Sequence, residues 1–162
     1  RRMSVRSWRS ERFVTVEAIY GVILYAALIA GVSDDDSDMV EVLVVSVISL
    51  VIFWAAHVYA GTIVNHVAKA PLHSAIWKAM THSSGMLWAA IIPSIPLVLG
   101  AFTLVAADDA VDWSLNLVTL QLGVLGFVAL SQRGVHMVAR IFGAIGTALF
   151  GTLIIALNAS VH

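Results

Sequence analysis

Five long apolar stretches divide this chain and constrain its fold more than any other feature. They cover residues 13–32, 39–64, 86–107, 113–130 and 141–157, and short polar segments separate them. A helix needs roughly 17–25 apolar residues to cross roughly 30 Å of hydrocarbon, so each stretch is long enough to span a membrane. The stretches also lack the alternating pattern of membrane β-barrel strands. The sequence therefore predicts an all-α polytopic membrane protein with five transmembrane helices.

Composition supports the same fold class. Of the 162 residues, 60% are hydrophobic and only 12% are charged, whereas soluble domains average about 25% charged residues. The chain has no cysteine, which excludes disulfides, thiolate metal sites and cysteine nucleophiles. Its basic residues are not clustered as a nucleic-acid footprint requires, so the expected partner is the lipid bilayer and not a nucleic acid.

The charged residues sort by the side on which five spanning helices would place them. All nine basic residues fall within residues 1–12, 65–85 and 131–140, which are on one side. Aspartate clusters follow the first and third stretches, on the other side. The positive-inside rule then puts a basic tail, residues 1–12, in the cytoplasm and the C-terminus outside, with residues 13–162 forming the transmembrane domain. The expected location is a plasma membrane of the bacterial inner-membrane type.

Residues 71–82 differ from the five stretches. Pro71 suits the first turn of a helix, and Leu72, Ile76 and Met80 recur at helical spacing. Two interpretations stay open: a short helix lying on the cytoplasmic surface, or the lower end of the third span.

Ionisable residues inside the stretches are the main functional signal. An ionised carboxylate at membrane depth costs a few kcal/mol, so Glu17 needs a partner, a water-filled cavity or a proton. His57 on the second helix lies at a similar depth, and we expect it to pair with Glu17. Tyr20 lies one turn above Glu17, and His82 enters at the base of the third helix. Together these four residues are typical of a proton relay or a cation-binding vestibule.

Two alternatives use the same residues. In the first, Glu17 and His57 only tie two helices together, and the protein is an accessory or structural subunit. In the second, His57 and His82 hold a haem between them, although no motif supports this. A metal site built from Glu17, His57 and His82 also stays open. The leading prediction includes no cofactor.

The acidic residues and the small residues suggest two further roles. In a homo-oligomer, the aspartates would form a negative outer mouth that concentrates cations. They are Asp34, Asp35, Asp36, Asp38, Asp108, Asp109 and Asp112. In the fifth stretch Gly143, Thr147 and Gly151 repeat at four-residue spacing, and Gly123 belongs to a similar stripe in the fourth. Such stripes favour close helix packing over a pore lining.

No enzyme motif is present in the sequence. HExxH, GxSxG and phosphate-binding glycine loops are absent, as is an aspartate pair inside the spans. The sequence thus predicts a small ion channel or transporter for a cation or proton that works as a homo-oligomer, and not an enzyme.

Overall fold

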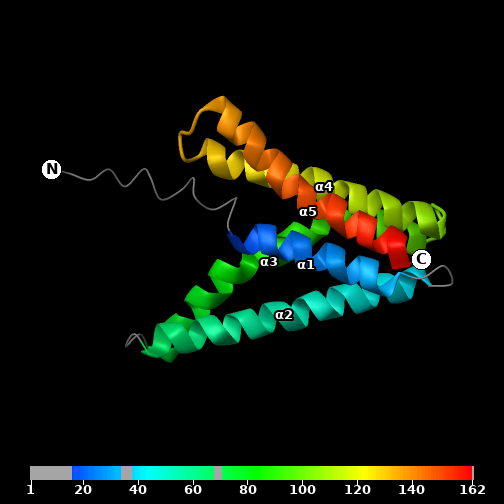
Figure 1. Cartoon of the computed structure of the whole chain (residues 1–162). Helices are drawn as coiled ribbons and strands as arrows, with labels where there is room; N and C mark the ends of the chain where they lie inside the picture. The colour runs from blue at the N-terminus through cyan, green and yellow to red at the C-terminus, as the bar shows by residue number, and fades with distance from the viewer. Residues whose placement is uncertain (1–15, 34–37, 68–70, 162) are drawn as a thin grey trace.

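The computed structural model describes residues 16–33, 38–67 and 71–161, and all regular structure in these residues is helical. There are five helices, α1 Val16–Val32, α2 Met39–Val67, α3 Leu72–Ala101, α4 Ala107–Ser131 and α5 Met137–Val161. The helices alternate in direction, so the α2–α3 and α4–α5 connections lie at one end of the bundle and the α1–α2 and α3–α4 connections at the other (Figure 1). The predicted fold class, all-α with five helices, is confirmed.

Four of the helices, α2 to α5, are long and apolar enough to cross a membrane. The described part of α1 has 17 residues and is apolar but shorter. Residues 1–15, which include the predicted basic tail and the start of the first stretch, lie outside the described residues.

Helix α1 is the centre of the bundle, because each of the other four helices packs against it. Its buried residues follow a helical stripe, Ala18, Val22, Tyr25, Ala26 and Ile29. Helices α2 and α3 pack on one another beside α1, and α4 and α5 form a second antiparallel pair (Figure 1). The core thus forms where α1, α3 and α4 meet, and α2 adds Met39, Val42 and Leu50 to it.

Helix α2 is rich in β-branched residues, which have only modest helix propensity in water. In hydrocarbon, backbone N–H and C=O groups have no water partners, so a spanning segment forms a helix whatever its intrinsic propensity. The helix begins after Asp38, whose Oδ1 accepts a hydrogen bond from the Val40 N–H at 2.9 Å.

The third helix differs from the predicted stretch at both ends. It begins at Leu72, so residues 72–82 are its first three turns, which confirms the interpretation as the lower end of the third span and not the one as a separate surface helix. It ends at Ala101, and residues 102–106 form a turn where the sequence predicted helix. The Thr103 N–H donates to the Gly100 carbonyl at 2.8 Å and the Leu104 N–H to the Leu99 carbonyl at 2.9 Å, the Schellman pattern that ends a helix. The sequence does not reveal this helix end, because the apolar side chains of Phe102 and Leu104 continue the apolar stretch beyond it.

Candidate functional site

A close helix crossing builds the candidate site. Helices α1 and α3 run in the same direction and meet at Gly21 and Met86 (Figure 1). A Cβ on Gly21 would lie 2.7 Å from both the Cα and the carbonyl oxygen of Met86, so only glycine permits this approach. One turn before the crossing on each helix stand Glu17 and His82. The crossing therefore places these two side chains opposite each other.

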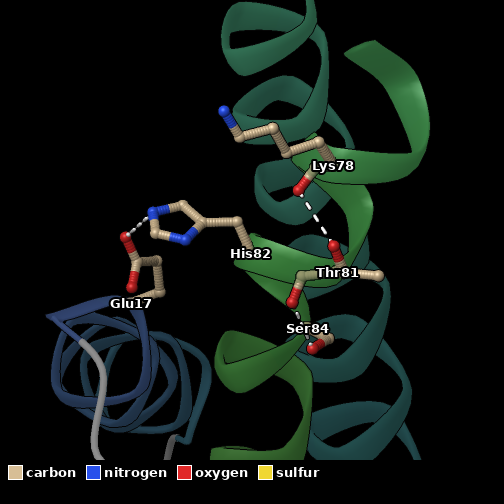
Figure 2. A network of polar contacts seen from close by, with 5 residues as sticks. All are labelled: Glu17, Lys78, Thr81, His82 and Ser84. Carbon is tan, nitrogen blue, oxygen red and sulfur yellow. Dashed lines mark hydrogen bonds and ion pairs between the residues drawn. The ribbon is translucent and has the colours of Figure 1, made fainter. Parts of the chain in front are cut away.

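Glu17 and His82 form a direct polar contact. Figure 2 shows the His82 ring extending from α3 toward the Glu17 carboxylate on α1, and Nε2 lies 2.8 Å from Oε1. The Glu17 side chain is 14% exposed and that of His82 is 68% exposed. The carboxylate is thus largely enclosed, while the imidazole reaches the surface. With a protonated imidazole the contact is an ion pair, and with a neutral one the Nε2–H donates to the carboxylate.

Lys78 lies one turn before His82 on α3, and the dashed contact to Glu17 comes from His82 and not from the Lys78 ammonium group (Figure 2). The hydroxyl of Thr81 donates to the Lys78 carbonyl at 3.1 Å, and that of Ser84 donates to the Thr81 carbonyl at 2.9 Å. These hydroxyls therefore bond to the backbone of their own helix, and among the described residues His82 is the polar partner of Glu17.

The predicted pairing of Glu17 with His57 is wrong. The ring of His57 on α2 instead stacks against Tyr20, with centroids 6.4 Å apart and an angle of 29° between the planes. Glu17 and His57 do lie at similar depths. However, depth does not determine which helix packs against the face of α1 that carries Glu17, and that helix is α3. All four predicted residues gather at one end of α1, in two separate contacts.

A second polar cluster, which the sequence analysis missed, surrounds the prolines of α3. Pro93 has no N–H, which frees the carbonyl of Ala89 four residues earlier, and Gln121 Nε2 on α4 donates to that oxygen at 2.9 Å. On the same helix, the Ser114 hydroxyl donates to the Pro93 carbonyl at 2.6 Å. Helix α4 thus supplies hydrogen bonds to the proline-interrupted part of α3.

Helix α1 contributes to this cluster through Tyr25. Its hydroxyl lies 2.7 Å from Ser94 Oγ, which itself donates to the Ala90 carbonyl at 2.7 Å. Since Ser94 has a single hydroxyl hydrogen, Tyr25 is the donor in their shared bond. A signal for this cluster was present in the sequence: polar Tyr25 and Gln121 lie within apolar spans, and Pro93 must leave one carbonyl without its helical partner.

The described residues contain no group of three His, Asp or Glu side chains placed to hold a metal ion. His57 and His82 contact Tyr20 and Glu17 respectively. Of the predicted acidic mouth, Asp34, Asp35 and Asp36 lie outside the described residues. Asp38, Asp108, Asp109 and Asp112 are exposed at the end of the bundle that holds the α1–α2 and α3–α4 connections (Figure 1).

The small residues of α5 lie against α4. The Thr147 hydroxyl donates to the Leu122 carbonyl at 2.8 Å. A Cβ on Gly151 would lie 2.8 Å from the Cα of Thr119, and one on Gly143 would overlap Leu130. Gly123 has more room, with Ala148 Cβ at 3.7 Å from its Cβ position. In this structure the stripe therefore serves contact between two helices of the same chain.

Comparison with known proteins adds no functional assignment, since no family model, curated protein or solved structure matches this chain.

Proposed function

We propose that this chain is an integral membrane protein that moves a proton or a small cation, working as a homo-oligomer, with Glu17 and His82 as the ion-handling pair. One observation carries the proposal. A largely enclosed carboxylate at the end of the central helix contacts an imidazole that reaches the surface. Such a pair can pass a proton between solvent and the protein interior, because each group binds and releases one proton.

The membrane placement rests on helix length and charge. Helix α3 has 30 residues and is about 45 Å long, enough to cross roughly 30 Å of hydrocarbon and reach both interfaces. Exposed Trp77 near its start suits the inner interface. His82 follows five residues later, about 7 Å deeper along the helix. The described basic residues Lys78, Arg133 and Arg140 belong to the end with the α2–α3 and α4–α5 connections, which we assign to the cytoplasm.

Further along the seam between α1 and α3, polar groups appear again at Tyr25 and Ser94. Between them and Glu17 the seam is closed by the Gly21–Met86 contact. Under this proposal the structure is a closed state, and ion passage requires α1 and α3 to separate at that contact.

A second candidate function is favoured by the same contact. Because the pair lies one turn from the close α1–α3 approach at Gly21, it would also serve as a clamp in a protein that transports nothing. The clamp role belongs to an accessory or structural membrane subunit.

Ion flux in proteoliposomes separates the two candidates. Wild type, Glu17→Gln and the control Glu41→Gln, an exposed carboxylate near the opposite end of the bundle, would be tested with proton, sodium and potassium gradients imposed separately. The transport proposal expects flux in wild type and Glu41→Gln and its loss in Glu17→Gln. Equal flux in all three would refute the role of Glu17. No flux in any, with lower thermal stability of Glu17→Gln alone, would favour the clamp.

A further inference from the structure

A long apolar groove lies between α2 and α3. Its volume is about 740 Å³, and it is lined by Val47, Leu50 and Val51 of α2 and by nine residues of α3 between Ser84 and Leu99. This volume falls within the roughly 300–1,000 Å³ typical of sites for small hydrophobic ligands. No lining residue is charged, and the only hydroxyl groups are those of Ser84 and Ser94. The groove is therefore suited to an apolar occupant.

The groove arises because α2 and α3 diverge. At their connected end the helices are close, with Ala79 Cβ 3.3 Å from the Cβ position of Gly61. From that end they spread apart along the bundle (Figure 1). Buried Leu50 and Ala90 lie at its floor, and Ser94 connects that floor to α1 through Tyr25. The groove is thus a consequence of the helix arrangement and not of one flexible side chain.

Neither hydroxyl in the groove has a free hydrogen. Ser84 donates to the Thr81 carbonyl and Ser94 donates to the Ala90 carbonyl. An ordered water needs about two to four polar partners, which this lining does not supply. Apart from the indole N–H of Trp88, the lining offers a polar ligand no free side-chain donor, so most of its hydrogen bonds to water would be lost without replacement. Hydrocarbon has no hydrogen bonds to water to lose, so it is the occupant that enters the groove at the lowest cost in free energy.

The groove opens to the side of the bundle that would face lipid. Trp88, Ile91 and Val51 line it and are 69%, 51% and 44% exposed. Residues 84–99 extend about 22 Å along α3, most of the roughly 30 Å hydrocarbon layer. The shape is elongated along the helices, as a lipid chain is in a bilayer.

We propose that this groove binds one acyl chain of a membrane phospholipid. The inference shares the membrane placement used above but does not depend on ion movement, so a failure of the flux experiment leaves it untouched. A second copy of the chain is the competing occupant, and the experiment below distinguishes it.

The test uses the full chain in phosphatidylcholine vesicles that contain a small share of phosphatidylcholine with a photoreactive diazirine in its acyl chain. After irradiation, lipid adducts are mapped by mass spectrometry in wild type, Ile91→Trp and Ile92→Trp. Ile91 lines the groove, whereas its neighbour Ile92 is 46% exposed and does not. Tryptophan at position 91 would fill the groove, and at position 92 it would face bulk lipid.

We expect wild-type adducts to concentrate on the lining residues of α2 and α3 relative to the exposed face of α5. In Ile91→Trp they should fall about tenfold, the factor that corresponds to 1.4 kcal/mol of binding free energy, and Ile92→Trp should match wild type. If Ile91→Trp does not fold, Val51→Trp with its neighbour Ile52→Trp as control gives the same comparison from α2. Even labelling of all exposed faces, or equal adducts in the filled and control variants, would overturn the proposal. So would a groove without adducts in a protein whose copies cross-link across it.

Discussion

Glu17 Oε1 and His82 Nε2 lie 2.8 Å apart because Gly21, one turn further along α1, lets that helix touch the backbone of α3 at Met86. The pair and the crossing share one register, since the same number of residues separates Glu17 from Gly21 and His82 from Met86. A change that separates α1 from α3 at Gly21 should therefore also break the contact between Glu17 and His82.

Gly21→Ala tests this register. Its Cβ would lie 2.7 Å from two backbone atoms of Met86, which cannot move independently of α3. We expect a loss of about 1–3 kcal/mol in the free energy of unfolding, as for other overpacked sites, measured by circular dichroism in detergent. Gly31→Ala on the same helix is the control, because nothing lies within 4 Å of its Cβ position. Equal stability of the two variants would show that α1 and α3 do not cross at Gly21.

A double-mutant cycle with Glu17→Ala and His82→Ala measures the pair itself. Because the His82 side chain is 68% exposed, water weakens the contact, and we expect a coupling free energy of about 0.5–1 kcal/mol. The cycle of Glu17→Ala with His73→Ala should give none, since exposed His73 is more than two turns from His82 on α3. Coupling of the same size in both cycles would argue against a specific contact.

Gln121 and Pro93 should be energetically coupled through the Ala89 carbonyl. In the wild type, Gln121→Leu leaves this carbonyl without a donor, and we expect a cost of about 1–3 kcal/mol. Pro93→Ala restores a backbone N–H that can bond to the same oxygen. Gln121→Leu should therefore cost less in the Pro93→Ala background, measured by unfolding in detergent. Strictly additive effects would mean that Gln121 does not compensate for the proline.

Among the described residues, Thr103 is the one non-glycine residue with a positive φ, 58°, and it lies in the turn that follows the end of α3. A β-branched residue is strained in this conformation, whereas glycine adopts it freely. Thr103→Gly should therefore raise the free energy of unfolding by about 0.5–1 kcal/mol. Thr152→Gly, inside α5, should lower it because glycine weakens a helix interior. Destabilisation by both changes would contradict the left-handed geometry at Thr103.

The sequence by itself determined how many helices form and where polar groups lie along them. Each apolar run is long enough for a membrane helix, and in hydrocarbon the backbone must satisfy its hydrogen bonds within the segment. The positions of Glu17, Tyr20, His57 and His82 along the spans also predicted that these residues lie at one end of the bundle, where the structure has them. The sequence left the start of α3 open between two interpretations, and it placed the end of α3 too late because Phe102 continues an apolar run after the helix has ended.

Only the tertiary structure decided which helices lie side by side. The position of a residue in the sequence gives its depth along a helix, but it does not tell which neighbouring helix its side chain contacts. Glu17 meets His82 and not His57, because the missing side chain at Gly21 admits Met86 on a helix far away in the sequence. Gln121 likewise finds the carbonyl freed by Pro93 through the packing of α4 on α3. These pairings depend on the shapes of surfaces that come together only when the bundle forms.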